Sequence, residues 1–212
     1  MTTFLLILIA IIAYLLGAVN GAIIASKYIF RRDIRNYGSH NAGLTNFYRV
    51  FGVPGTALVL VIDVLKTVFA VLIGGWLLGI VKEPMVGRLF AGFCAILGHC
   101  YPVYYGFKGG KGVLCGAVVA LFASPGVGVV CIVVFVILLI LTRYVSLASI
   151  VSAALLPLGI WIGLGKGHGL EGVIGLFCFL LIAFQHRKNI SRLLKHEEPK
   201  FSFKVPPRGF GE

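Results

Sequence analysis

The sequence predicts an all-α membrane protein: a single bundle of seven transmembrane helices, with the N-terminus outside and the C-terminus in the cytoplasm. The 212 residues are 59% hydrophobic, and their mean hydropathy is +1.01. A soluble domain of this size has too little interior to bury so much apolar surface. Repeated apolar runs longer than about 18 residues indicate transmembrane helices. Because the runs are continuous rather than alternating, a β-barrel is disfavoured.

The apolar segments lie, in chain order, at residues 4–30, 53–81, 86–105, 112–123, 126–141, 145–164 and 170–186. The first has no Lys or Arg before its apolar core, and that core exceeds the roughly 7–15 residues of the hydrophobic region of a signal peptide. We therefore expect it to be retained as the first span. Within it, Gly17, Gly21 and Ala25 recur every four residues, which predicts close packing against another helix.

The number of spans depends on Ser124-Pro125-Gly126, where Pro and Gly together predict a turn rather than a kink. With this turn there are seven spans, and nearly all of the 19 basic residues lie in inside segments, as the positive-inside rule requires. With six spans, Arg143 and the basic tail would lie opposite the first two basic loops. The basic residues that do not lie in inside segments are Lys66, within a span, and the outside residues Lys82, Arg88 and Lys166.

The net charge of +12 lies in loops and a tail beside the membrane spans. It therefore predicts contact with membrane lipids and no nucleic-acid partner. We expect residues 1–212 to form one transmembrane domain that acts as a monomer. About the last ten residues are expected to be a flexible cytoplasmic tail.

A polar stretch, YGSHNAGLTNFYR, stands out between two apolar runs. Ser39 or Asn41 can cap a following helix, on which Thr45, Asn46 and Arg49 share one face. An Arg flanked by hydroxyls and amides suits phosphate, because its planar guanidinium supplies a fork of donors. The alternative is a solvated loop in which Arg49 contacts lipid headgroups.

A glycine-rich segment, GFKGGKGVLCG, precedes the fourth apolar run. Gly109, Gly110 and Gly112 let the backbone approach a ligand, and the helix start offers unpaired N–H groups. Lys108 and Lys111 add positive charge, so the segment predicts a phosphate site. It is not a Walker A loop, because Gly rather than Ser or Thr follows Lys111. The alternative is a flexible basic loop at the inner surface.

A third cluster, QHRKNI, follows the last apolar run. His186 and Asn189 stand three residues apart and share a helix face. The histidine is a candidate base, donor or orienting group. The alternative is an interfacial anchor, a role that Arg187 and Lys188 suit.

Charged and polar residues also occur within or beside the spans. Asp63 and Lys66 lie three residues apart in the second apolar segment, and we expect them to form a structural pair. The tight turn TRYVS carries Ser146 on the inside, and His99 lies near an inside helix end.

Some chemistries are disfavoured by what the sequence lacks. Of its seven Asp and Glu residues, the one candidate for an inside-facing metal pair is Glu197 with Glu198, and neighbouring residues rarely share one ion, so we expect no metal and no cofactor. No His is followed five positions later by Asp, and no GxSxG motif occurs. None of the five cysteines forms a CxxC pair, and we expect them to be buried free thiols.

The chain resembles the bacterial integral-membrane glycerol-3-phosphate acyltransferases that use acyl phosphate as donor. The resemblance rests on GSHNAGLTNFYRVFG, GFKGGKGV, LTRYVSLASI and HRKNISRLLKHEEPKF, in the family's order. It implies a seven-helix fold in the cell inner membrane, with the site on the cytoplasmic face. It also implies acyl transfer to the 1-hydroxyl of glycerol 3-phosphate, giving lysophosphatidic acid in the first committed step of phospholipid synthesis, without acyl-CoA, acyl carrier protein or metal.

The resemblance also implies site residues. The catalytic set is Ser39, Arg49, His186 and Asn189, and the substrate- or phosphate-binding set is Asn41, Thr45, Asn46, Lys108, Gly109, Gly110, Lys111, Gly112 and Ser146. Glu198 falls in the last motif, and we expect it to be structural. The chain departs from the family pattern at three positions, namely His40, Cys115 and Gln185.

The chemistry of this reaction suits the residues present. Acyl phosphate is already activated, so the site must bind two phosphates, aim a hydroxyl and stabilise an oxyanion. The base is either His186 or a substrate phosphate oxygen, and direct transfer is expected rather than an acyl-enzyme. Two other functions remain open: a small transporter of an anionic metabolite, and a lipid-binding structural protein.

Overall fold

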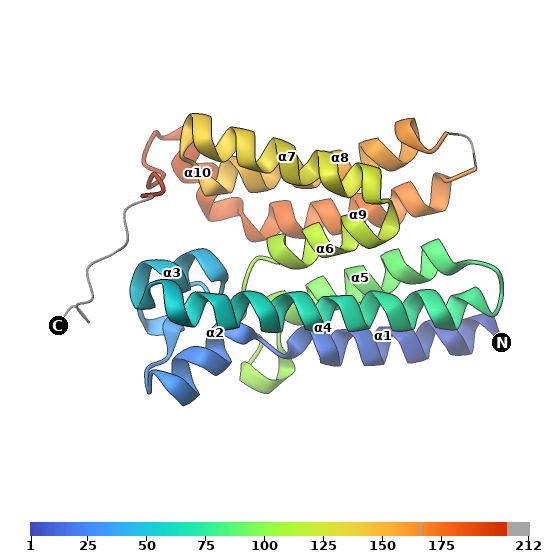
Figure 1. Cartoon of the computed structure of the whole chain (residues 1–212), viewed down its shortest axis with the longest axis horizontal. Coiled ribbons are helices and arrows are strands. Elements are labelled where there is room, and N and C mark those ends of the chain that lie inside the picture. Colours follow the sequence, from blue (N-terminus) through green and yellow to red (C-terminus); the bar gives the residue numbers. More distant parts are fainter. Residues whose placement is uncertain (166, 203–212) are drawn as a thin grey trace.

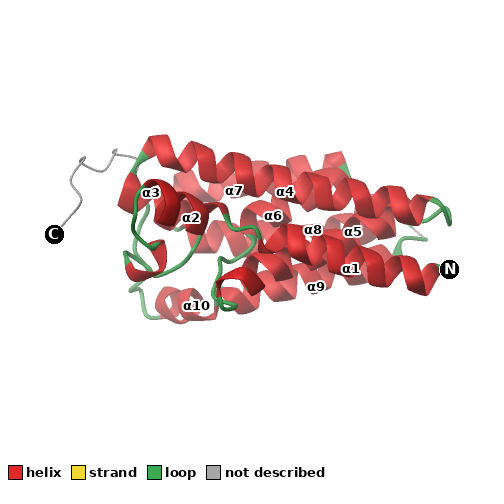
Figure 2. Ribbon diagram, turned by 90° about the horizontal axis from the view of Figure 1, so that it is seen from below, coloured by secondary structure: helices red, strands yellow, loops and turns green. Residues whose placement is uncertain are grey.

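The computed structural model describes residues 1–165 and 167–202, and every regular element in this part is a helix (Figures 1 and 2). The α-helices are α1 (Thr2–Ala18), α2 (Gly21–Ile24), α3 (Leu44–Phe51), α4 (Val53–Gly79), α5 (Pro84–Cys100), α6 (Val113–Ala123), α7 (Pro125–Thr142), α8 (Val145–Gly163), α9 (Gly169–Gln185) and α10 (Arg187–Leu194). The shorter helices are the π-helix η1 (Ala25–Ile29) and the 3-10 helices η2 (Ile34–Asn36) and η3 (Val103–Tyr105). The predicted all-α class is confirmed.

The long helices form two layers with one short helix between them (Figure 1). Helices α1, α4 and α5 pack together in one layer, and α7, α8 and α9 form the other. Helix α6 contacts α4 and α5 as well as α7 and α8, and so joins the layers. The N-terminus lies at one end of the long axis, while α3 and α10 lie at the other. The polar segments next to α3 and α10 are therefore brought to the same end.

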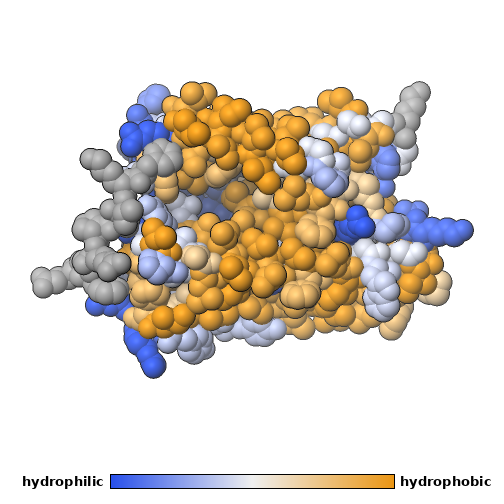
Figure 3. Space-filling view, in the orientation of Figure 1, coloured by the Kyte–Doolittle hydropathy of each residue, from blue (hydrophilic) through white to orange (hydrophobic). Residues whose placement is uncertain are grey.

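The outer surface is apolar along the middle of the bundle and more polar toward its ends (Figure 3). Large apolar side chains such as Phe69, Trp76 and Ile140 are exposed on it. Water would disfavour so broad an apolar surface, whereas lipid tails solvate it. The surface is that of an integral membrane protein.

Helices long and apolar enough to cross a membrane number five among the described residues, and a sixth candidate is the pair α9 and α10, which is bent by 62°. Each of the seven predicted segments corresponds to a helix or run of helices. Helix α6, however, has 11 residues and is about 16 Å long, roughly half the thickness of a hydrocarbon core. It cannot span the membrane alone, and seven complete crossings stay a prediction.

The first apolar segment is long enough for one span, Thr2–Ile29, but its helix is interrupted. Val19 ends α1 in an extended conformation, and the side chain of Asn20 accepts a hydrogen bond from the Ile23 N–H at 3.0 Å, which caps α2. The close packing predicted along this segment is present, because a methyl group on Gly17 would overlap the Ala95 backbone, and one on Gly21 would crowd Val59.

The predicted turn at Ser124-Pro125-Gly126 separates α6 from α7. Pro125 begins α7, where the missing N–H of proline costs nothing. Gly128 packs against the backbone of Leu121, so the two helices lie close beside each other. The expectation of a turn rather than a kink is confirmed. The expected flexible tail falls on residues 203–212, outside the described residues.

Candidate active site

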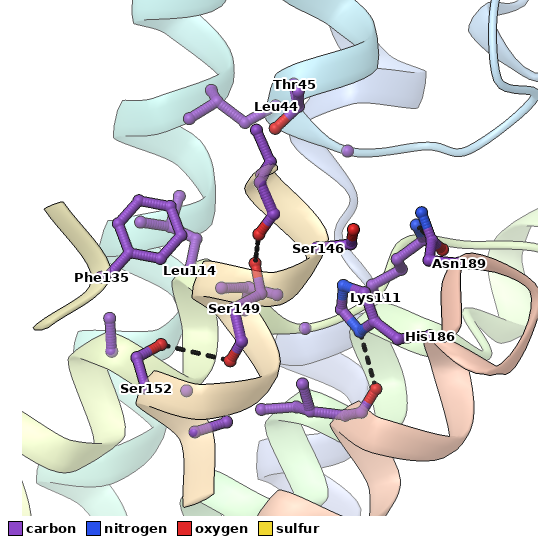
Figure 4. Close-up of a pocket in the computed structure, with 18 of the residues that line it drawn as sticks. Leu44, Thr45, Lys111, Leu114, Phe135, Ser146, Ser149, Ser152, His186 and Asn189 are labelled. Carbon is purple, nitrogen blue, oxygen red and sulfur yellow. Dashed lines mark hydrogen bonds between the residues drawn. The ribbon is translucent and has the colours of Figure 1, made fainter. Parts of the chain in front are cut away.

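A cavity of about 900 Å³ lies among α3, α6, α7, α8, α9 and α10. One side is polar: Lys111, His186 and Asn189 lie together there (Figure 4). The other side is apolar and includes Leu114, Phe135 and Leu156. Figure 3 shows a hydrophilic recess between the apolar surfaces of the two layers. The cavity therefore offers a charged end and an apolar end within one space.

Glu198 organises the polar end. Its Oε1 accepts hydrogen bonds from the hydroxyl of Ser146 and the side-chain amide of Asn189, each at 2.7 Å, and its Oε2 accepts one from Arg192 Nε at 2.7 Å. Burial raises the pKa of Glu198, but the hydrogen bonds from Asn189, Ser146 and Arg192 outweigh it and lower the pKa below its usual range. The carboxylate thereby joins α8, α10 and the segment after α10.

Lys111 extends this network into the glycine-rich segment. Its Nζ donates to Asn189 Oδ1 at 2.5 Å. Burial lowers the pKa of Lys111 to about 8, with the neighbouring Arg192 and Arg49 acting in the same direction and Glu198 opposing them. Because Lys111 is partly buried and lies near other cations, an anionic ligand would favour its charged form and raise its pKa toward the usual value.

The glycine-rich segment uses its amides differently from the sequence prediction. The N–H groups of Gly109 and Gly110 donate to the carbonyls of Cys100 and His99, at 3.1 and 3.0 Å. A methyl group on Gly110 would overlap His99 Nε2 and crowd the Ala42 carbonyl. The close approach at this glycine is therefore to protein, because the chain itself fills the space where a ligand was expected. The expected phosphate cradle cannot use these two N–H groups.

The following residues do face the cavity. Gly112 adopts φ +81°, a left-handed conformation that favours glycine, and it is the N-cap of α6. Gly112, Val113 and Leu114 line the cavity wall. The first N–H groups of a helix have no partner within the helix, and the helix dipole adds positive potential there. Lys108 is exposed and is not among the cavity-lining residues.

The 39–49 stretch contributes Ser39, Asn41, Thr45 and Arg49 to the cavity wall. Asn46 is buried instead, and its side chain holds the loop: Oδ1 accepts from the Ser39 N–H at 2.8 Å, while Nδ2 donates to the carbonyls of Tyr37 and Asn41 at 3.0 Å. Asn46 thus fixes the conformation that presents Ser39 and Asn41. The expected helix from Thr45 to Arg49 is present as part of α3, but its N-cap is Gly43 rather than Ser39 or Asn41.

His186 lies at the bend between α9 and α10 and is 2% exposed. Its Nδ1 lies 2.8 Å from the carbonyl oxygen of Ile182 (Figure 4). Because a carbonyl only accepts hydrogen bonds, Nδ1 must carry the proton. In the neutral ring, Nε2 is then an acceptor. This tautomer leaves one ring nitrogen free to take a proton or to orient a hydroxyl.

The pair in α4 forms as expected: Lys66 Nζ lies 2.7 Å from Asp63 Oδ1, and both residues are buried. Asp63 and His99 also line the cavity, whereas Lys66 does not. All five cysteines are free and buried, which confirms that expectation.

Several cavity residues were not singled out from the sequence. Arg192 lies three residues after Asn189, and this spacing on α10 was the available signal. Ser149 and Ser152 also line the cavity, as do Lys188, which was considered as an interfacial anchor, and His40, which departs from the family pattern. The two serines follow Ser146 at three-residue spacing, but each hydroxyl bonds a carbonyl of its own helix. Among the described residues, no group of three or more His, Cys, Asp or Glu side chains is placed to hold a metal ion.

The fold and the cavity define a polytopic membrane protein in which a basic pocket adjoins an apolar one within the bundle. The sequence profile of the glycerol-3-phosphate acyltransferase family matches residues 7–196. The chain belongs to this family.

Relatives and solved structures cover nearly the whole chain. A glycerol-3-phosphate acyltransferase of Thermoanaerobacter pseudethanolicus is 42% identical over 202 residues, covering 94% of this chain and 97% of that protein. One from Finegoldia magna is 36% identical over 195 residues, covering 92% and 96%. The crystal structure of PlsY (YgiH), an integral membrane glycerol 3-phosphate acyltransferase, in its glycerol 3-phosphate form superposes with a TM-score of 0.81 at 34% identity, covering 93% of this chain and 96% of that one. Its lysophosphatidic acid form gives a TM-score of 0.78 at 32% identity, with coverage of 93% and 95%.

Proposed function

We propose that this chain is a glycerol-3-phosphate acyltransferase that transfers a fatty acyl group from acyl phosphate to the 1-hydroxyl of glycerol 3-phosphate. The products are lysophosphatidic acid and phosphate. The observation that carries the proposal is the cavity, which joins three separate basic and polar segments to an apolar wall. A substrate with a phosphate head and an acyl chain needs both surfaces within one site. A transporter or a structural lipid-binding protein would not require the acyltransferase family's motifs.

Cations at the polar end supply the phosphate contacts. The cavity is lined by four cations, namely Arg49, Lys111, Lys188 and Arg192. The Glu198 carboxylate already accepts hydrogen bonds from Asn189 and Arg192. Arg49 offers a planar fork to one phosphate, and Lys111 offers a compact charge near the start of α6. The exposed position of Lys108 suits a role in attracting anions rather than in holding them.

The reaction is a direct displacement at the acyl carbonyl. The 1-hydroxyl oxygen of glycerol 3-phosphate forms a bond to the carbonyl carbon, and the bond from that carbon to the phosphate oxygen breaks. The hydroxyl proton passes to a phosphate oxygen or to Nε2 of His186. The first N–H groups of α6 and the Ser39 hydroxyl are proposed to stabilise the oxyanion, and Ser39, Val113 and Leu114 line the cavity. Because the donor is already activated, the protein accelerates the reaction mainly by positioning the two substrates and by stabilising charge.

The remaining roles follow from the contacts. Asn41, Thr45 and Ser146 line the polar end and are proposed to bind substrate, as is the backbone at Gly112. Gly109, Gly110 and Asn46 act by holding the loops. Asn189 aligns the ammonium group of Lys111 with the glycerol phosphate, and no metal or other cofactor is required.

The proposed setting is the cell inner membrane, with seven segments, the N-terminus outside, and the site on the cytoplasmic face. The basic loops and α10 support this orientation through the positive-inside rule. We propose that the whole chain acts as one domain, since segments from Ser39 to Pro199 line the same cavity, and that it acts as a monomer. Single cysteines at Thr2 and Glu212 should label from opposite sides of the membrane. Labelling of the five native cysteines should be low, because they are buried. Labelling of both ends from the same side would refute the topology.

Reconstituted protein given acyl phosphate and glycerol 3-phosphate tests the activity. We expect one lysophosphatidic acid per phosphate released, no release without glycerol 3-phosphate, and no loss of activity with a chelator. Lys111→Met should lose the activity. Uptake of glycerol 3-phosphate into vesicles without acylated product would overturn the proposal in favour of a transporter.

A further inference from the structure

Three buried side chains form a compact polar cluster at the wall of the cavity. Lys66 Nζ lies 2.7 Å from Asp63 Oδ1 and 2.9 Å from His99 Nδ1. The three residues are only 5%, 1% and 4% exposed, respectively. Asp63 and His99 line the cavity, while Lys66 lies behind them. Buried charges are costly in a membrane protein unless they are paired and hydrogen-bonded, as these are.

The contact between Lys66 Nζ and His99 Nδ1 indicates one protonation pattern for the cluster. An ammonium group only donates hydrogen bonds, so Nδ1 of His99 must accept the one from Lys66. The imidazole is then neutral, with its proton on Nε2, and the charges of Asp63 and Lys66 cancel. Because Nε2 already carries a proton, His99 is not placed to accept one from a substrate. Lys66 also neutralises a carboxylate that would otherwise repel phosphate.

The cluster holds the interruption of the first helix. Lys66 Nζ also donates to the carbonyl of Val19 at 2.7 Å, and Asp63 Oδ1 accepts from the Gly21 N–H at 3.2 Å. Between these two points, the side chain of Asn20 donates to the Ala42 carbonyl at 3.1 Å. The broken helix is thereby tied both to α4 and to the loop that carries Ser39 and Asn41.

The same cluster supports the glycine-rich segment. The Gly110 N–H donates to the main-chain carbonyl of His99 at 3.0 Å, and the His99 ring fills the space beside Gly110. The Ala42 N–H reaches the Gly109 carbonyl at 3.4 Å. Lys111 follows directly in the chain. Two attachments of the segment before Lys111 therefore lead back to Lys66, through His99 on one side and through the first-helix break on the other, beside a third from the Gly109 N–H to the Cys100 carbonyl.

We propose that Lys66 and Asp63 are positioning residues: they hold the broken first helix and His99 so that the glycine-rich segment presents Lys111 to the substrate phosphate. This inference rests on the proposed function for the identity of that phosphate. Lys66 acts through two donated hydrogen bonds, to Val19 and His99, and Asp63 provides the charge that keeps Lys66 stable in the membrane.

The double variant Asp63→Asn, Lys66→Met separates positioning from simple charge compensation. The pair becomes neutral, and the introduced asparagine side chain still has an oxygen for the Gly21 N–H, so we expect folding to survive, with a Tm within about 5 °C of the parent. The two bonds from Lys66 are lost, so the KM for glycerol 3-phosphate should rise about ten-fold or more, equivalent to about 1.4 kcal/mol. Thr67→Val is the matched control, because the buried Thr67 hydroxyl bonds only the Asp63 main chain.

The pKa of Lys111 gives a readout that needs no activity. Competitive labelling of lysines, resolved by peptide mass, should show the pKa of Lys111 rising from about 8 toward its usual 10.5 in the double variant, as the segment loosens and water enters. The labelling of Lys82, in the α4–α5 turn, should not change. The Thr67→Val control should retain the parent pKa at Lys111.

The outcomes are distinct. If the parent protein makes no lysophosphatidic acid, the proposed function is refuted. If the Lys111 pKa is nevertheless shifted in the double variant, the positioning role still holds. An active parent with an unchanged KM and an unchanged Lys111 pKa in the folded double variant overturns the inference, and the pair is then structural only. If the double variant does not fold, Lys66→Arg carries the test. It keeps the charge but alters the geometry, and an unchanged KM and Lys111 pKa there also overturn the inference.

Discussion

Glu198 accepts a hydrogen bond from the Ser146 hydroxyl at 2.7 Å, which ties the segment after α10 to the first turn of α8. The two residues are 52 positions apart in the chain. The same carboxylate also accepts hydrogen bonds from Asn189 and Arg192. One acidic residue in a strongly basic protein thus orients three side chains at the cavity. The negative charge of Glu198 also offsets the repulsion between Arg192 and Lys111.

Glu198→Gln should therefore lower both activity and stability, because Arg192 loses its charged partner. We expect kcat/KM to fall about ten-fold or more. Glu197→Gln, at an exposed neighbouring position, should have little effect. Because folding lowers the pKa of Glu198 below its ordinary 4.5, the ionised carboxylate stabilises the fold above about pH 4.5, and this contribution is lost as the pH falls through the folded pKa. The Tm gap between parent and Glu198→Gln should accordingly be wide near neutral pH and narrow in acid.

Lys111 should set the alkaline limit of activity. With a pKa of about 8, its ammonium group is charged below that pH and neutral above it, so kcat/KM should decline above about pH 8. Bound phosphate favours the charged form, so the limit in kcat should lie higher. In Lys111→Arg the side chain stays charged at alkaline pH. The alkaline limit of kcat/KM should therefore move to higher pH, even if the maximum value of kcat/KM falls. Lys195→Arg, at an exposed position after α10, is the control; an unmoved limit in Lys111→Arg would contradict the assignment.

The apolar runs predicted the fold well, because a segment that crosses lipid must be apolar and must satisfy its backbone hydrogen bonds internally, as a helix does. Each predicted segment contains helix, and the Ser124 turn was found from Pro and Gly alone. The interruption after Val19 was not predicted. It follows no helix-breaking proline and depends on contacts of Asn20 and Gly21 with residues distant in sequence. The length of α6 was visible in the sequence, but its place between two layers is a tertiary property.

Polar clusters in an apolar chain predicted the residues of the candidate site, since such side chains are retained near membranes only where they are satisfied or functional. Ser39, Lys111 and Asn189 were brought together as expected. What each residue touches was harder to predict. Asn46 was expected to bind substrate, yet its amide bonds the loop. Sequence spacing reports which residues share a face, but not which neighbour occupies the space in front of them.

Gly110→Ala should destabilise the protein, because the added methyl group would overlap the His99 ring and crowd the Ala42 carbonyl. Overpacking of this kind typically costs about 1–3 kcal/mol. Thermal unfolding in detergent should show a clear fall in Tm. Gly163→Ala is the matched control, because the same methyl group meets open space at the end of α8. An unchanged Tm with a raised KM would instead show that the close neighbour is a ligand.

Arg49→Lys should reduce kcat/KM by about 10- to 100-fold, the equivalent of one charged hydrogen bond. Lysine keeps the charge but loses the planar fork of donors. The control is Arg187→Lys, because Arg187 lies on α10 near the site but stacks on Phe184 and is absent from the cavity wall. Equal, small losses in both variants would make Arg49 a headgroup anchor rather than a substrate ligand.

His186→Asn should lower kcat while leaving the shape of the pH profile intact. The Nδ1 proton is held by the Ile182 carbonyl, so Nε2 is the only nitrogen available to the substrate. The group that holds Nδ1 is a neutral carbonyl rather than a carboxylate, and it gives the ring less help in carrying a positive charge during proton transfer. A substrate phosphate oxygen can accept the proton in its place. We therefore expect His186 to orient the glycerol hydroxyl through Nε2.

The measurement is the pH dependence of kcat in the parent and in His186→Asn. If the parent shows an ionisation near that of histidine, about 6.5 when unperturbed, and the variant lacks it, the orienting role is wrong and His186 is the general base. Full activity in the variant would exclude both roles. A fall in kcat with an unaltered profile and an unaltered Tm supports orientation, since a purely structural role at the α9–α10 bend would lower stability along with activity.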